Sequence, residues 1–126
     1  MISYFDPFEV RDVLLKDLIT QEDIADSTEY IDDIAIRLGV DPARIPVPAP
    51  YQVKMLAMCY TLMSVALNAA MNNGAGGENE ADAFELKRRV YAKRVADLEA
   101  QVTAQTLLGG GSSGGKIPVS ILLRRC

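Results

Sequence analysis

The sequence predicts an all-α fold, a four-helix domain with a C-terminal extended β-arm after a Gly-rich hinge. Apolar residues recur at helical spacing through most of residues 1–108, and capping and stop signals separate four such segments. A glycine- and serine-rich hinge at 109–115 then leads into a segment whose apolar residues alternate, the period of a half-buried strand. At 126 residues, 49% of them hydrophobic, the chain has room for one modest core. We therefore divide it into a helical domain, 1–108, and a flexible hinge and C-terminal arm, 109–126.

The first helix is predicted to begin at Asp6-Pro7-Phe8-Glu9, because Asp6 can cap it, Pro7 suits its first position and Glu9 can reach back to the cap. We expect it to run to about Leu18. Its apolar side would consist of Phe8, Val13, Leu14 and Leu18.

The second helix is predicted to begin after Thr20, a capping residue followed by acids, and to stop at Gly39. Its residues at helical spacing are Ile24, Ile31, Ile34, Ala35 and Leu38. Four prolines at 42, 46, 48 and 50 then predict a stiff connector, because proline removes amide donors and restricts the preceding residue.

The third helix, 51–71, is apolar nearly all round, which is typical of a buried helix. A loop at 72–80 separates it from a fourth helix, about 81–108, supported on its exposed side by the Glu85–Arg89 pair. The apolar stripe of this helix is Phe84, Tyr91, Val95, Leu98 and Val102. The uncharged stretch 55–71 is also just long enough to span a membrane, but its polar residues favour a core helix, and we expect no membrane partner.

Composition argues against an enzyme. The chain has no histidine, and its two cysteines, Cys59 and Cys126, have no ligand-like neighbours in the sequence, so we expect no metal site, no cofactor and no catalytic residues. Cys59 is predicted to be a small core residue. The N-terminus shows no basic region followed by an apolar run, so we expect no secretory signal and a cytosolic origin.

Charge is unevenly distributed along the chain. Residues 1–41 hold eleven acids and three bases (net −8), whereas residues 42–126 hold six acids and ten bases (net +4). Such a chain can associate head to tail, although both regions can equally be solvated faces. The basic cluster at 87–94 also has two interpretations. It can contact an acidic surface or phosphate groups, or it can be the solvent-exposed side of a helix.

The arm predicts a protein partner. A strand needs a neighbouring strand to complete its backbone hydrogen bonds, and the chain contains no second good strand. We therefore expect the arm to add a strand to another polypeptide, with Pro118 at the start or free edge. The predicted partner-binding residues are Ile117, Val119, Ile121, Leu123, Arg124 and Arg125.

An alternative is a helix-turn-helix-like DNA-binding regulator. The segments 22–25 and 34–40 are similar to the first helix and turn of such domains. However, a recognition helix should follow at once, and the proline-containing segment 41–46 stands there instead.

The layout resembles the small head–tail connector (adaptor) proteins of tailed bacteriophages. The resemblance rests on Asp6-Pro7-Phe8-Glu9, on 18–24, on the connector Ile45-Pro46-Val47-Pro48 with its buried helix, and on a final helix running from Arg88-Arg89-Val90-Tyr91 to Leu98. It covers roughly residues 5–108 as a pattern of helices and caps.

This resemblance implies a structural virion protein at the head–tail junction, made in the bacterial cytoplasm. It implies a homo-oligomeric ring beneath the portal protein, next to tail or neck proteins, with the C-terminal arm gripping the portal. DNA would pass through the ring's channel without specific binding. The candidates for subunit interfaces or channel lining are Asp23, Asp26, Asp32, Asp33, Arg88, Arg89 and Arg94.

Overall fold

The fold is that of a computed structural model, which describes residues 4–73 and 78–109, without the side chains of 72–73 and 78–82. In these ranges the chain forms helices and connecting turns and no strand, which confirms the all-α prediction for this part. The predicted arm and most of its hinge lie outside the described residues. In chain order the elements are the 3-10 helix η1 (Pro7–Glu9), α1 (Val13–Lys16), α2 (Gln21–Arg37), the 3-10 helix η2 (Pro42–Arg44), α3 (Tyr51–Asn73), α4 (Glu78–Gln101) and α5 (Ala104–Leu107).

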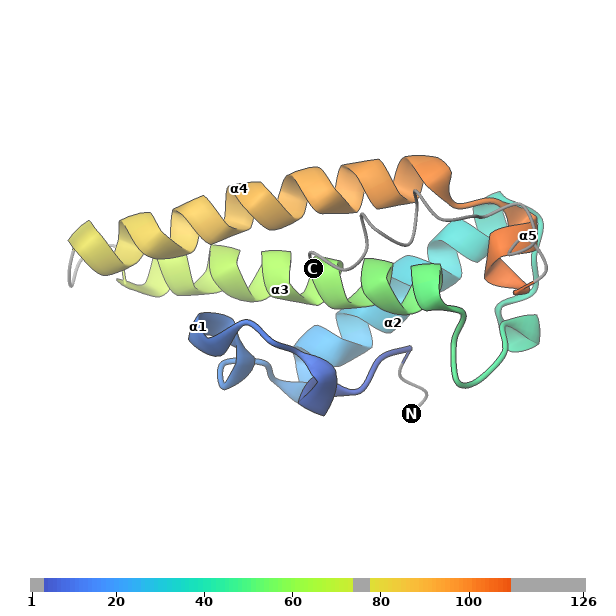
Figure 1. Cartoon of the computed structure of the whole chain (residues 1–126), viewed down its shortest axis with the longest axis horizontal. Helices are drawn as coiled ribbons and strands as arrows, with labels where there is room; N and C mark the ends of the chain where they lie inside the picture. The colour runs from blue at the N-terminus through green and yellow to red at the C-terminus, as the bar shows by residue number, and fades with distance from the viewer. Residues whose placement is uncertain (1–3, 74–77, 110–126) are drawn as a thin grey trace.

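Helix α3 is the centre of the molecule. It packs along most of its length against α4, and α2 crosses its other side (Figure 1). The short helix α1 and the N-terminal segment lie against α3 as well. Because α3 has neighbours on several sides, it is apolar nearly all round, as its sequence predicted.

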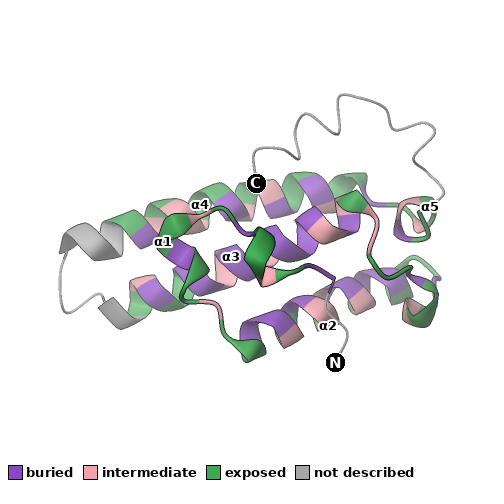
Figure 2. Ribbon diagram, turned by 60° about the horizontal axis from the view of Figure 1, so that its bottom comes forward, coloured by how far each residue is buried: buried purple, intermediate pink, exposed green. Residues whose placement is uncertain are grey.

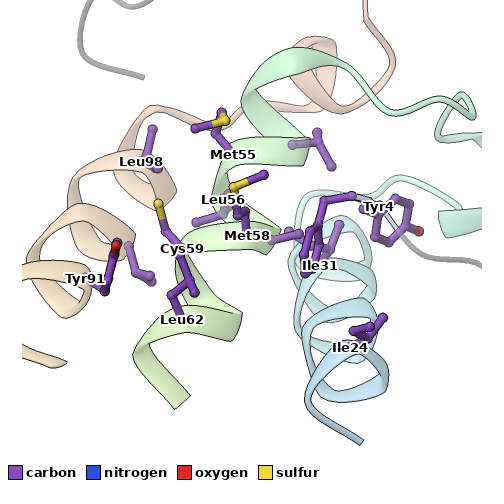
Figure 3. Packing of buried hydrophobic residues seen from close by; sticks show 14 of the residues in the cluster. Tyr4, Ile24, Ile31, Met55, Leu56, Met58, Cys59, Leu62, Tyr91 and Leu98 are labelled. Atoms are coloured by element: carbon purple, nitrogen blue, oxygen red, sulfur yellow. The ribbon is translucent and has the colours of Figure 1, made fainter. Parts of the chain in front are cut away.

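The core lies between α3 and its neighbours. Leu56 and Leu62 of α3 are almost completely buried, and Figure 3 shows core side chains of α3 between those of α2 and α4. Cys59 is fully buried, which confirms it as a core residue. Thr61 is buried too, and its hydroxyl donates to the carbonyl of Ala57 at 2.9 Å, so its polar group is satisfied.

Helix α4 presents its predicted apolar stripe to α3. The burial pattern along the helices is visible in Figure 2. All five predicted residues are buried: Phe84, Tyr91, Val95, Leu98 and Val102. The Glu85–Arg89 pair is confirmed as well, at 3.1 Å.

Helix α2 begins and ends where its sequence signals predicted. Thr20 and Asp23 form a reciprocal capping box, in which each side chain accepts from the other residue's backbone N–H. At the C-terminus Gly39 has φ of +79°, and the Val40 N–H donates to the Ala35 carbonyl at 2.8 Å. The predicted core residues of α2 are buried except Leu38, which is 40% exposed because it lies in the terminal turn.

The prediction of one helix from Asp6 to about Leu18 is wrong. The segment forms two short helices, η1 and α1, because Asp12 acts as a second N-cap whose carboxylate accepts from Leu14 N and Leu15 N, both at 3.1 Å. Because the helix is interrupted, a different set of side chains faces the core from the set predicted. Val10 and Leu15 are buried, whereas the predicted core residues are exposed: Phe8 (86%), Val13 (87%), Leu14 (41%) and Leu18 (45%).

The fourth helix also ends earlier than predicted. It stops at Gln101, and Thr103, in extended conformation, caps the separate helix α5 by accepting from the Thr106 N–H at 3.2 Å. A threonine hydroxyl competes well for a backbone amide, which favours a new helix start over a continued helix. The described fold therefore has three long α-helices, two short α-helices and two 3-10 helices, instead of four helices.

Candidate interaction surfaces

The N-terminal segment is held by a buried carboxylate. The Asp12 side chain is only 3% exposed, and its Oδ2 accepts from Lys87 Nζ at 3.0 Å and from the Tyr91 hydroxyl, both on α4. Its Oδ1 accepts the two backbone N–H groups that start α1. Asp12 therefore ties α1 to α4 across 75 and 79 residues of sequence.

The environment of this carboxylate changes the pKa values of its members. Burial raises the pKa of Asp12, but hydrogen bonds from Tyr91, Lys87 and the Leu15 N–H outweigh burial, so the net pKa is lowered. Burial, followed by the hydrogen bond to Asp12, raises the pKa of Tyr91. Asp12 is thus a charged acceptor at neutral pH and Tyr91 a neutral donor.

Further hydrogen bonds and ion pairs hold the surrounding elements together, and the sequence did not predict them. Lys54 Nζ donates to Glu9 Oε2 at 2.8 Å, so Glu9 binds α3 instead of closing a capping box with Asp6. The Tyr4 hydroxyl donates to Asp32 Oδ1 at 2.6 Å. These residues are far apart in sequence, and no local pattern marks them as partners.

Helices α2, α3 and α4 meet at a second set of such contacts. The Tyr30 hydroxyl donates to Glu99, and the Tyr30 ring stacks on Tyr60 with centroids 4.0 Å apart. Arg37 lies 3.8 Å from the same glutamate. Burial, with the bond to Glu99, raises the pKa of Tyr30. These contacts fix the crossing of α2 over α3.

The N-terminal segment exposes an apolar surface. We call Phe8, Val13, Leu14 and Leu18 the N-terminal apolar surface; Phe8 and Val13 are the most exposed large apolar side chains in the described residues. Phe8 and Val13 also line a shallow hollow of about 540 Å³, together with Glu9, Val10, Arg11 and Lys16. Side-chain bonds of Asp12 to α4 and of Glu9 to Lys54 on α3 attach this segment in the orientation that exposes these side chains. Fixed, exposed apolar side chains are typical of a contact surface for another molecule.

The structure assigns different roles to the four predicted acidic residues. Asp23 belongs to the capping box and is 8% exposed, and Asp32 accepts from Tyr4, so both are structural. Asp26 and Asp33 are exposed on α2. With Glu22 and Glu29 they occupy one side of the helix, at spacings of three and four residues.

The three predicted arginines are likewise separated. Arg88 makes a two-pronged contact with Glu85, at 2.9 and 2.7 Å, and Arg89 meets the same carboxylate. These contacts lower the pKa of Glu85 to about 2, with the Arg88 hydrogen bond as the largest cause. The Arg94 Nη1 atom is buried and has no hydrogen-bond partner. Only Arg89, whose side chain is 70% exposed, extends well into solvent.

The predicted partner-binding residues 117, 119, 121 and 123–125 lie outside the described residues. Among those that the structure describes, no group of three or more Cys, Asp or Glu side chains could hold a metal ion. One helix in the described part, α3, is long and apolar enough over Tyr51–Met71 to cross a membrane by length and composition; 56% of that window is buried in the fold.

No protein-family model, no curated protein and no solved structure matches this chain.

Proposed function

We propose that this chain is a structural assembly subunit, a head–tail connector (adaptor) of a phage-like particle. It forms a homo-oligomeric ring beneath the portal protein and contacts the portal and neighbouring tail or neck proteins. The N-terminal apolar surface carries the proposal: Phe8 and Val13 are 86% and 87% exposed, on a segment that the Asp12 carboxylate bonds to α4. Such a surface favours a chain whose role is to bind other proteins.

The C-terminal arm is the second part of the proposal. Its alternating residues need a sheet edge, and the described part of a neighbouring copy has no strand to offer. The acceptor is therefore the portal, another arriving protein, or the arm of a neighbouring copy. Several arms on one ring would bind together and gain from effective concentration, so each arm can be weak by itself.

The acidic side of α2 fits the passage of DNA. Glu22, Asp26, Glu29 and Asp33 are exposed along one side of this helix. Carboxylates repel the phosphate backbone, whose binding requires cations. Acids of this side that stay uncovered in the ring and line its channel let DNA pass without being held.

The alternative, a DNA-binding regulator, has less support. Helix α2 is followed by η2, a 3-10 helix of three residues (Pro42–Arg44), where a recognition helix would be needed. Salt-dependent, saturable binding of duplex DNA by the isolated chain would favour this alternative over the adaptor.

The arm can be tested by incorporation into particles. We expect removal of residues 116–126 to leave the helicity of the domain unchanged, measured by circular dichroism, and to abolish incorporation, measured by mass spectrometry of purified particles. Replacing Val119 and Ile121 by Asp should have the same effect, because both belong to the alternating apolar set. Ser120→Asp, on the other side of the predicted strand, is the matched control and should incorporate normally. Incorporation of the truncated chain at the wild-type level would contradict the role of the arm.

A further inference from the structure

The side of α4 that faces away from α3 combines apolar and basic residues. Leu86 and Val90 are 63% and 41% exposed, and Arg89 and Lys93 are exposed beside them. The four positions follow one another at spacings of three, one and three residues, so they share one side of the helix. We call them the α4 outer face. Around them, residues 86–94 contain five basic residues and no acid.

The side of α2 that faces away from α3 has the opposite charge. Glu22, Asp26, Glu29 and Asp33 are exposed and are followed by Ile36, which is 64% exposed. The five residues recur at intervals of four, three, four and three, a continuous stripe on one side of the helix, about 21 Å long. We call them the α2 outer face. None of its four carboxylates has an ion pair within the described part of the chain.

These two faces point to different sides of the molecule. Helix α4 runs along one side of α3, and the Gln21 end of α2 lies on the other (Figures 1 and 2). The core residues of both helices are buried, so each outer face is directed away from the core. A chain with unlike, complementary faces on different sides can associate with copies of itself, since each contact leaves one face of each kind free.

We propose that the α4 outer face binds the α2 outer face of a second copy of this chain. The evidence is charge complementarity: Arg89 and Lys93 meet the unpaired acids of α2, while Leu86 and Val90 supply apolar contact area next to Ile36. This contact deepens the proposed ring by naming the surfaces that join its subunits, and it leaves the N-terminal apolar surface and the arm free for other proteins. In such a ring, part of the acidic stripe is covered by the neighbouring subunit.

The contact can be tested by charge reversal on the full-length chain, with mass measured by sedimentation over a range of protein concentration. One variant carries Asp26→Lys and Asp33→Lys, and the other carries Arg89→Glu and Lys93→Glu. Each variant alone should associate at least about tenfold more weakly than the wild type, because like charges then oppose each other. Higher salt should weaken wild-type association, because the faces are exposed to solvent.

The rescue experiment separates this contact from a general effect of charge. A chain carrying all four substitutions exchanges two charges on each face, so that the new lysines on α2 meet the new glutamates on α4. It should again associate with itself, and an equimolar mixture of the two single-face variants should co-assemble. Arg44→Glu, which changes an exposed cation on η2 outside both faces, is the control and should associate like the wild type. Circular dichroism confirms that each variant is folded.

Two results would overturn the contact. One is a wild-type chain that stays monomeric up to millimolar concentration; the other is a fourfold variant that fails to associate although it is folded. Neither result depends on particles, because only the pure chain is measured. The contact and the proposed function can therefore fail separately.

Discussion

Asp12 shows how one side chain can determine a local fold and its attachment to the rest of the molecule. Its carboxylate starts α1 by accepting two backbone N–H groups, and it binds Lys87 and Tyr91 of α4 with its other oxygen. A buried carboxylate is stable only when such partners compensate its lost hydration. The same residue thereby breaks the first predicted helix and leaves Val13 exposed beside it.

We therefore expect Asp12→Asn to destabilise the protein by about 1–3 kcal/mol at neutral pH. Asparagine can still cap α1, but it removes the charge that Lys87 requires. The free energy of unfolding is measured by urea denaturation. Asp6→Asn is the matched control, because Asp6 is an exposed cap with one backbone bond, from Phe8 N, and it should change the free energy by less than about 0.5 kcal/mol.

The effect of Asp12→Asn should depend on pH in a defined direction. The folded protein lowers the pKa of Asp12 below its ordinary value of 3.8, so the charged carboxylate contributes stability that is fully present above that value. This contribution is lost as the pH falls below 3.8 through the lowered pKa, because the native carboxyl then takes up a proton. The difference between the wild type and Asp12→Asn should shrink over this range. A difference that stays constant down to the acid transition would contradict the role of the charge.

At the scale of helices, the sequence was most informative where one local signal was enough. Thr20 and Gly39 mark the two ends of α2 as predicted, and the spacing of apolar residues identified the buried stripe of α4. These features depend on backbone capping and on period, which neighbouring residues determine. The third helix was equally clear, because it is apolar on nearly every side.

The predictions of helix ends were wrong where a distant residue or a competing cap determines where a helix begins or stops. Whether Asp12 caps a helix or faces solvent depends on Lys87 and Tyr91, which follow 75 and 79 residues later. Thr103 ends α4 with a signal that is visible in the sequence but no stronger than those of many threonines inside helices. Among the predicted site residues, the sequence could not distinguish Asp23 and Asp32, which are structural, from exposed Asp26 and Asp33, because all four lie on the same acidic helix.

The glycine that ends α2 leads to a prediction about substitutions at a helix end. Gly39 has φ of +79°, a conformation that costs an L-residue about 1–2 kcal/mol, and a Cβ added there meets no atom within 4 Å. Gly39→Ala should therefore destabilise the protein by about 1 kcal/mol through the backbone alone. Gly39→Asn should cost less, because asparagine tolerates this conformation better. Thermal unfolding of the two variants measures the difference, and an alanine variant as stable as the wild type would contradict it.

At the scale of the molecule, one core joins all three long helices. Buried side chains of α2, α3 and α4 form a single cluster, and α3 contributes to it on several sides (Figure 3). The polar ties run between the same elements, from Tyr30 on α2 to Glu99 on α4 and from Asp12 to Lys87. A fold of this size with one shared core is expected to unfold cooperatively.

Substitutions on α3 test this cooperativity. Leu56 is fully buried at the centre of the core, so Leu56→Ala should lower the free energy of unfolding by about 2–5 kcal/mol. Leu67→Ala, on the same helix but 43% exposed, is the matched control and should cost clearly less. Far-ultraviolet circular dichroism reports the helices, and the near-ultraviolet signal reports the packing of the tyrosines, which include the Tyr30–Tyr60 stack between α2 and α3. In the wild type and in both variants the two signals should change at the same urea concentration, because loss of the α3 core removes the support of both. Separate transitions would show that parts of the fold unfold independently.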